Sequence, residues 1–190
     1  SDVVAGRCAP ADAIYPCVTM PGVSLMPAPA SGEDLVPERV MLRLVPLLKR
    51  YFDRVILDSP AGVGRGFRAA AAADCALIVC NSDPVCIRDA SIVRRLLTEL
   101  EVPQQRLVIN RFNAEYFGSL SAGREDAGGL RDLDDVIDQS GVRLIGIVPE
   151  DRQMTAAFQR GCVPADDLPG MTALSRIAAR MNGVSVPLSL

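Results

Sequence analysis

The sequence predicts an α/β protein with a mostly parallel sheet and helices on both of its faces. Short apolar runs rich in Val, Ile and Leu alternate with stretches of helical periodicity, which is typical of βαβ units. With 190 residues, of which 49% are hydrophobic, the chain is long enough to bury one sizeable core. We therefore expect a single α/β domain over residues 1–182, followed by a short tail over 183–190.

The amino-terminal third has the least regular pattern. Several prolines and glycines over residues 1–22 predict a loop with one short helix, and 23–27 has the composition of a short strand. Ser31 is a suitable cap for a helix whose apolar residues recur at helical spacing and which should end near Tyr51. Pro46 lies inside this helix, and we expect a kink there.

Four apolar runs predict the strands of the sheet, and turn residues bound each of them. These strands are expected at 54–57, 75–81, 106–110 and 142–148. The helices between and after them are expected at 67–73, 85–100, 130–139, 151–160 and 171–182. The polar segment 118–129, rich in Gly and Ser, predicts a loop.

Composition excludes several kinds of chemistry. The chain has no histidine, so His-dependent nucleophilic or metal chemistry is excluded. Lys49 is its single lysine and follows Leu48, so the 190 residues contain no Gly-Lys-Ser/Thr phosphate loop. A net charge of −3 with arginines spread along the sequence indicates no nucleic-acid or anionic-lipid surface. No apolar run approaches the roughly 20 residues that span a bilayer.

The cysteines indicate a reducing compartment. None of the six forms a C-x-x-C pair, and Cys75 and Cys80 fall in an apolar run where cysteine behaves as a small hydrophobe. We therefore expect buried, structural thiols and no disulfide framework.

Asp58 ends the predicted strand at 54–57 and begins the turn Asp58-Ser59-Pro60-Ala61-Gly62. Open α/β sheets bind ligands at the carboxyl ends of their strands, where NTPases place an acid beside Mg²⁺ or its water shell. A simpler interpretation is that Asp58 forms the turn by bonding to its own backbone.

Four short motifs follow the predicted strands in a fixed order: Asp58-Ser59-Pro60-Ala61-Gly62, Arg88-Asp89, Asn110-Arg111 and Val148-Pro149-Glu150-Asp151. In this order they resemble the MinD/ParA family of deviant Walker P-loop ATPases, and within it the MinD branch of septum-site ATPases. Asp2–Gly6 and Gly161–Pro164 are similar to that family as well, so the resemblance covers residues 1–182. It implies a fold of the P-loop NTPase type, incomplete at the amino terminus.

The resemblance implies a role for each motif. Asp58 matches the acid that supports the magnesium shell, through water, and the following residues match the switch that senses the γ-phosphate. These switch residues are Ser59, Pro60, Ala61 and Gly62.

Two further motifs match the part of the family's site that holds the base. Asn110 and Arg111 match the segment that contacts adenine, although Asn110 could simply cap a loop. The loop that closes over the base matches Pro149, Glu150 and Asp151. Proline and acids are also what a helix start favours, so this motif has a purely structural alternative.

A fourth motif matches a surface for other chains. Arg88 and Asp89 match a helix start near the nucleotide-dependent dimer and partner surface. A charge pair that merely begins a helix is the alternative.

The resemblance also sets expectations for the intact protein. It implies ATP and Mg²⁺ as cofactors, ATP hydrolysis, a homodimer, and a division inhibitor or activator as partner. It implies a bacterial cytoplasmic protein and leaves open a peripheral association with the inner membrane. Such an association would use a basic amphipathic helix, and residues 183–190 do not have that pattern.

This chain departs from the family pattern where the phosphates are bound. The Lys-Gly-Gly-x-Gly-Lys-Thr loop and its strand, which would lie beside the Asp58 strand, are not in the sequence. We therefore expect the 190 residues to be a fragment of a MinD-like ATPase that neither binds ATP tightly nor unfolds with normal cooperativity alone.

Two other classes of function remain open from the residues. One is a non-catalytic interaction module that binds a partner through the helix 88–100. The other, disfavoured because paired cysteines are lacking, is a metallocluster carrier similar to iron proteins.

Overall fold

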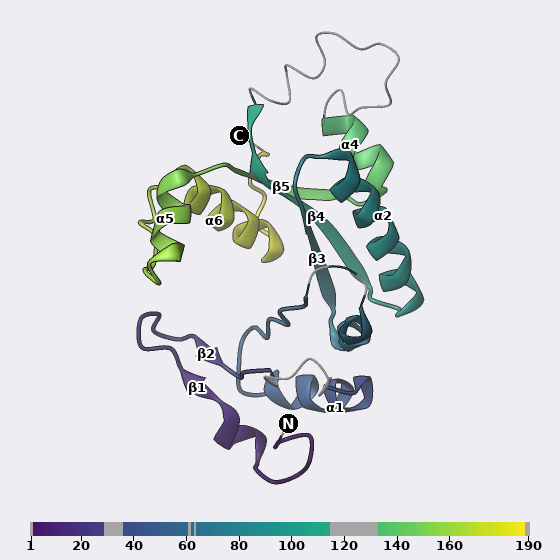
Figure 1. Cartoon of the computed structure of the whole chain (residues 1–190), viewed down its shortest axis with the longest axis vertical. Helices are drawn as coiled ribbons and strands as arrows, with labels where there is room; N and C mark the ends of the chain where they lie inside the picture. The colour runs from purple at the N-terminus through teal and green to yellow at the C-terminus, as the bar shows by residue number, and fades with distance from the viewer. Residues whose placement is uncertain (1, 29–35, 61, 63, 115–132, 189–190) are drawn as a thin grey trace. The chain divides into compact units, whose positions relative to one another are not determined.

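The computed structural model describes residues 2–28, 36–60, 62, 64–114 and 133–188 (Figure 1). The chain divides into two compact units. Unit 1 comprises Ser1–Asp74 with Glu99–Val102, and unit 2 comprises Cys75–Thr98 with Pro103–Leu190. The single domain over 1–182 stays a prediction, and each unit is described by itself.

Unit 2 contains a three-stranded parallel sheet in the order β3-β4-β5. Its strands are β3 (Cys75–Cys80), β4 (Gln104–Phe112) and β5 (Leu144–Pro149). Three predicted strands are thus confirmed, although β4 is longer than predicted and β5 begins two residues later. Within this unit α2 and α4 lie on one side of the sheet and α5 and α6 on the other (Figure 1).

The four helices that are described in unit 2 confirm the predicted periodicity. They are α2 (Pro84–Glu99), α4 (Leu133–Ser140), α5 (Arg152–Gln159) and α6 (Pro169–Met181). Asp83 caps the first of them, because its Oδ1 accepts a hydrogen bond from the Cys86 amide at 2.9 Å. The predicted loop 118–129 and the predicted helix start at Leu130 lie outside the described residues.

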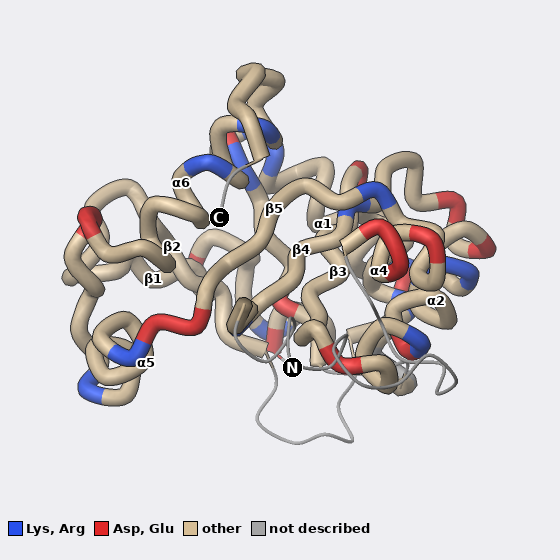
Figure 2. The backbone as a smooth tube through the Cα atoms, turned by 90° about the horizontal axis from the view of Figure 1, so that it is seen from above, with Lys and Arg blue, Asp and Glu red and all other residues tan. Residues whose placement is uncertain are grey.

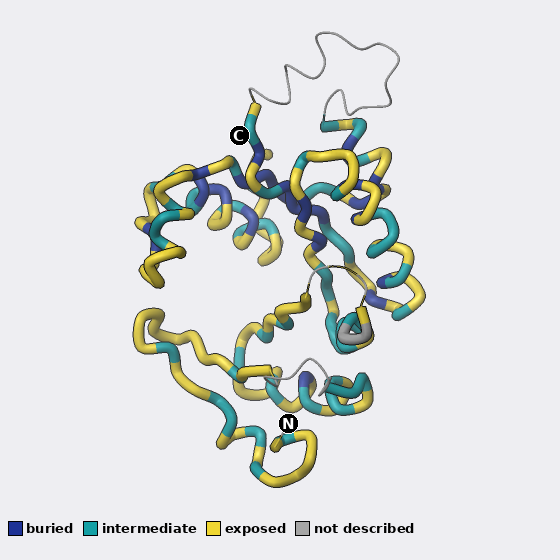
Figure 3. The backbone as a smooth tube through the Cα atoms, viewed as in Figure 1, coloured by how far each residue is buried: buried dark blue, intermediate teal, exposed yellow. Residues whose placement is uncertain are grey.

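The core of unit 2 lies on both faces of β4 and β5, where Figure 3 shows buried residues concentrated. Between the sheet and α6, a cluster of buried side chains comprises Val108, Ile145, Val148, Ala173 and Ile177. Gly146 permits this contact, because a Cβ on it would lie 2.2 Å from Cγ1 of Ile177. A glycine in β5 therefore allows α6 to pack closely on the sheet.

Unit 1 has little regular structure. A short antiparallel pair joins β1 (Tyr15–Pro16) to β2 (Ser24–Leu25), and η1 (Pro10–Ala13) is the short helix expected in the first 22 residues. The strand expected at 23–27 is confirmed in its centre, whereas β1 has no counterpart among the predicted elements. The helix α1 (Glu38–Leu48) and the 3₁₀ helix η2 (Arg65–Ala72) contact each other.

The predicted strand at 54–57 is wrong for the structure as it stands. Residues 54–60 are assigned to neither helix nor strand, and Ile56 has 89% of its surface exposed. A strand is defined by hydrogen bonds to a neighbouring strand, and none of the described strands pairs with this segment. The apolar pattern was strand-like, but a pattern alone supplies no pairing partner.

Two predicted helices differ in detail. The first begins at Glu38 with Pro37 as its cap, because Pro37 is held in an extended conformation at ψ 141°. Ser31, the cap expected from sequence, lies outside the described residues. Pro46 is accommodated inside α1. The helix predicted at 67–73 is present as η2, which is wound as a 3₁₀ helix. In the described part of the chain, no helix is long and apolar enough to cross a membrane.

Candidate functional site

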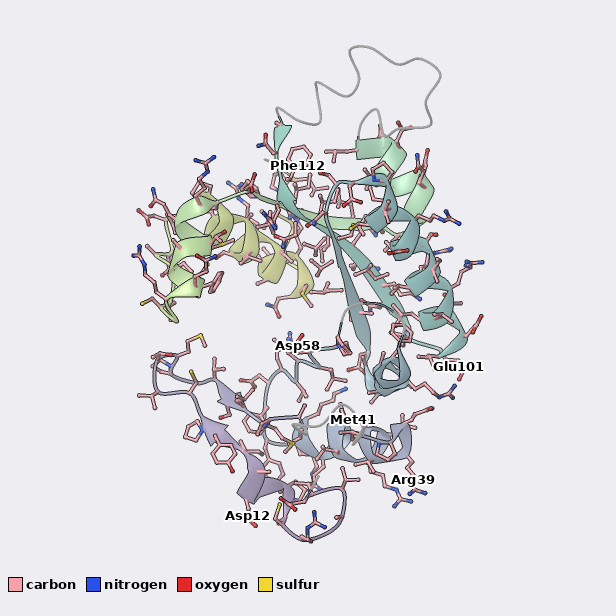
Figure 4. All side chains as sticks on the ribbon, viewed as in Figure 1. Asp12, Arg39, Met41, Asp58, Glu101 and Phe112 are labelled. Atoms are coloured by element: carbon pink, nitrogen blue, oxygen red, sulfur yellow. The ribbon has the colours of Figure 1, made fainter. Side chains whose placement is uncertain are left out.

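The carboxyl ends of β4 and β5 bring two of the predicted motifs together in unit 2. Phe112 pairs with Pro149, and the Glu150 amide donates a hydrogen bond to the carbonyl oxygen of Phe112 at 2.9 Å. Because the two strands are parallel, Asn110 and Arg111 at the end of β4 meet the turn that follows β5. Figure 4 labels Phe112 at this end of the strand.

A bulge near the end of β4 sets the direction of Arg111. Ile109 pairs with Ile147 and Phe112 with Pro149, so three steps along β4 face two along β5. Arg111 lies inside this irregularity and has a positive φ of 52°, a conformation that is uncommon outside glycine. Its Nη2 donates to Oε1 of Glu150 at 3.4 Å. Bulges of this kind often re-aim a side chain near a binding site.

An open cavity of about 290 Å³ lies beside this turn. It is lined by Phe112, Asn113, Ala114, Glu150 and Arg152. Its volume is near the lower end of the range for small-molecule sites, about 300 Å³. Of the predicted residues, only Glu150 lines it, whereas Asn110 and Arg111 lie in the strand that leads to it.

The lining residues that were not predicted from the sequence are Phe112, Asn113, Ala114 and Arg152. They are adjacent to the Asn110-Arg111 and Glu150-Asp151 motifs, so extending each motif by a few residues would have found them. Phe112 is buried, so the groups available to a flat heterocycle are an amide, a guanidinium and a carboxylate, which can hydrogen-bond it.

Asp151 is committed to the fold. Its Oδ1 accepts the Met154 amide at 2.9 Å as the N-cap of α5, and its Oδ2 accepts the Gly170 amide at 3.2 Å. The hydrogen bond from the Met154 amide, with a further one from Gly170, holds the pKa of this carboxyl below its usual value. The helix-start interpretation of this motif is therefore confirmed, and a nucleotide contact by Asp151 stays a prediction.

The Asp58 segment belongs to unit 1 and is exposed. Asp58, Ser59 and Pro60 are all exposed, and within the described residues the Asp58 carboxylate makes no hydrogen bond or ion pair. Gly62 has a φ of 79°, which suits glycine, and Ala61 lies outside the described residues. The magnesium-shell and switch roles therefore stay predictions.

Arg88 and Asp89 lie in α2 of unit 2, one turn after Asp83. Both are exposed, as a surface for another chain requires, whereas the neighbouring Ile87 is completely buried. Their role in a dimer or partner surface stays a prediction.

The described residues contain no group of three or more acidic or cysteine side chains that could hold a metal ion. Cys80 is 8% exposed, and burial raises the pKa of its thiol to about 11. At neutral pH this cysteine is a protonated core residue, in agreement with the structural role expected for it.

The parallel sheet flanked by helices defines the class of protein, and solved structures share it. The chain matches MinD from Aquifex aeolicus in its complex with MinC at a TM-score of 0.85 and 29% identity, covering 100% of this chain and 74% of that one. MinD from Pyrococcus horikoshii, solved with Mg-ADP, matches at a TM-score of 0.74 and 24% identity over 95% and 72% of the two chains. The fold is that of the P-loop NTPases of the MinD/ParA type.

Sequence comparison identifies the family within this class. The septum site-determining protein MinD of Synechocystis is 32% identical over 192 residues, which cover 98% of this chain and 69% of that protein. No family model matches the sequence. The chain belongs to the MinD family of cell division site-selection proteins.

Proposed function

We propose that the protein acts in division-site selection as part of a MinD-type ATPase, and that the cavity of unit 2 receives the adenine base. The observation that carries this proposal is the convergence of Asn110-Arg111 and Pro149-Glu150 at one edge of the sheet, beside a cavity of about 290 Å³. Ligands of open α/β sheets bind at this edge. The P. horikoshii relative was solved with Mg-ADP, which supports an adenine nucleotide as ligand. The A. aeolicus relative was solved in complex with MinC, which supports a division inhibitor as partner.

In this proposal each motif has a defined task. Asn110 and Arg111 approach the base from β4, and Glu150 closes the opposite wall of the cavity. Asp58 and the switch residues Pro60, Ala61 and Gly62 act at the phosphate end through a magnesium-bound water. Arg88 and Asp89 contribute to the surface of a homodimer.

The residues fit the base better than they fit the phosphates. The cavity offers an amide, a guanidinium and a carboxylate, whereas Asp58 belongs to no group of three or more acidic or cysteine side chains among the described residues. The one lysine, Lys49, is bound to Asp74 through its Nζ at 2.6 Å. Phosphoryl transfer depends on a phosphate loop and a positioned metal, so we propose that these 190 residues bind ATP weakly by themselves.

Two measurements on the chain test this proposal. Isothermal titration with Mg-ATP should show no binding in the micromolar range, and micromolar binding would overturn the weak-affinity part. Titration with 5′-AMP at millimolar concentration, followed by ¹H–¹⁵N NMR, should give saturable shifts at Asn113, Ala114 and Glu150 and none at Asp58.

A matched pair of variants separates base binding from a general effect of the nucleotide. Asn113→Ala removes an amide that lines the cavity and should weaken 5′-AMP binding, whereas Asn182→Ala, at the end of α6, should leave it unchanged. Absence of any shift around the cavity at about 10 mM 5′-AMP would contradict the proposed base site.

A further inference from the structure

One face of α1 carries three arginines and is turned away from the rest of unit 1. With 100° per residue, Arg39, Arg43 and Arg50 fall within about 40° of one another, opposite the side that carries buried Val45 and half-buried Met41. Figure 4 shows Arg39 projecting away from α1. Arg50 follows the last helical residue, but the Phe52 amide still donates to the Leu48 carbonyl, so the winding continues. We call these three residues the arginine stripe.

Among the described residues, the arginine stripe is the part of α1 whose charges have no acidic partner. Elsewhere on this helix Glu38 accepts from Arg68 at 2.7 Å, and Lys49 binds Asp74 at 2.6 Å. None of the three arginines has a hydrogen bond or ion pair with any described residue. The chain has a net charge of −3, and Figure 2 shows basic and acidic residues both distributed along the backbone, so the three arginines form a local positive patch.

Apolar side chains border the arginine stripe on both sides. Leu42 is 47% exposed and Leu47 is 39% exposed, one on each flank of the arginines, and Tyr51 follows at 74%. Arginine, tyrosine and apolar side chains in one patch are the composition of protein interfaces, in which Arg and Tyr are enriched.

We propose that the arginine stripe binds an acidic helix of another protein. The rise of 1.5 Å per residue separates Arg39 from Arg43 by about 6 Å and Arg43 from Arg50 by about 10.5 Å along the axis. Carboxylates spaced by four and seven residues on a facing helix repeat the same separations, so each can meet one guanidinium. Leu42 and Leu47 then contact apolar residues that flank those carboxylates. This partner surface is separate from the proposed nucleotide site.

The same features argue against an anionic membrane or a nucleic acid as the ligand. More than half of each flanking leucine is covered by the protein, so neither can enter an acyl layer as an interfacial helix does. A phosphate backbone would use the arginines but leave the two leucines and Tyr51 without an apolar contact. Three charges on a chain of net charge −3 provide little attraction to either polyanion.

The test uses the full chain and a synthetic partner. The probe is a fluorescein-labelled 20-residue helical peptide with Glu at positions spaced by four and seven residues and Leu beside them. Fluorescence anisotropy should show saturable binding that weakens between 50 and 300 mM NaCl. The R39Q/R43Q/R50Q variant should bind about tenfold or more weakly, as expected for the loss of three interface ion pairs.

The control variant R95Q/R143Q/R160Q also removes three positive charges, at exposed arginines outside α1. It should bind the peptide like the wild type. A control peptide with Gln in place of Glu should not bind. Circular dichroism of both variants checks that they fold. Equal loss in the control variant, or equal binding of the Gln peptide, overturns the proposal. Stripe-dependent binding of vesicles with 30% phosphatidylserine or of a 20-bp DNA duplex, without peptide binding, also overturns it.

Discussion

Two apolar runs of similar composition have different outcomes in the two units. In unit 2, Cys75–Cys80 is a strand, and each of its residues pairs with a residue of β4. In unit 1, Val55–Leu57 is also an apolar run that precedes a polar turn, yet it pairs with none of the described strands, and Ile56 is almost fully exposed. The difference shows that β-structure depends on a pairing partner as much as on the sequence of the strand itself.

The same contrast applies to the cores. Nearly all the buried hydrophobic residues among those described belong to unit 2, and only Val45 and Val102 belong to unit 1. Unit 2 has a sheet with helices on both faces, so one set of apolar residues can be enclosed from two sides. The described part of unit 1 has one α-helix, which packs on a 3₁₀ segment and encloses much less. We therefore expect equivalent substitutions to affect the two units very differently.

The largest expected difference is between two isoleucines. Ile109→Ala, in a completely buried position of β4, should lower the free energy of unfolding by about 3 kcal/mol, because it removes buried methyl groups and leaves a cavity. Ile56→Ala should change it by less than about 0.5 kcal/mol, because that side chain is 89% exposed. Urea unfolding followed by circular dichroism measures both. A similar cost at both positions would mean that residues 54–58 pack into a core in solution.

Two glycines give the next largest contrast. Gly146→Ala places a Cβ 2.2 Å from Ile177 and should cost about 1–3 kcal/mol of stability, because α6 must move away from β5. Gly64→Ala introduces a methyl group with nothing within 4 Å and should be nearly neutral. The urea midpoints of the two variants test this, and a neutral Gly146→Ala would show that α6 does not rest on the sheet as described.

Much of unit 2 could be predicted from the sequence, because its signals are local and agree with one another. The strands β3, β4 and β5 each pair with another strand of the same unit, and helical periodicity marks the segments between them. The start of α1 could be predicted from Pro37, because proline favours the extended conformation of a residue that precedes a helix. Whether residues 54–57 form a strand could not be predicted from their own sequence, because strand formation depends on a neighbouring strand with which to pair.

The candidate site was predictable only in part for a similar reason. The motifs at Asn110 and Glu150 locate the correct edge of the sheet, because parallel strands place their carboxyl ends together. The bulge that gives Arg111 a positive φ depends on the register of two strands, which single-sequence patterns do not contain. The cavity wall at Arg152 arises from the start of α5, whose cap is Asp151.

Acid should reveal a smaller difference between two aspartates. Asp151 in unit 2 has a lowered pKa, so its stabilising effect is complete above the unfolded pKa of about 3.9 and is lost as the pH falls through the lower, folded pKa. Asp151→Asn should lower the urea midpoint at pH 7 and flatten its fall between about pH 5 and pH 2. Asp12→Asn, at a 3.3 Å contact with the Ala9 amide in the exposed η1, should leave the urea midpoint at pH 7 nearly unchanged. Parallel acid profiles for Asp151→Asn and wild type would contradict the role of Asp151 as a cap.

The smallest expected effects come from one exposed ion pair chosen in each unit. Lys49–Asp74 in unit 1 has a short separation of 2.6 Å, and Arg111–Glu150 in unit 2 a longer one of 3.4 Å. Both pairs are largely exposed to solvent, so water and salt screen them despite the different lengths. Lys49→Met and Arg111→Met should each lower stability by about 0.5 kcal/mol or less at 0.1 M NaCl, and the loss should vanish at 1 M. If Lys49→Met lowered stability by more than about 1 kcal/mol and the loss persisted in high salt, unit 1 would enclose Lys49 more tightly in solution. The contrast between the two units would then be weaker than the structure indicates.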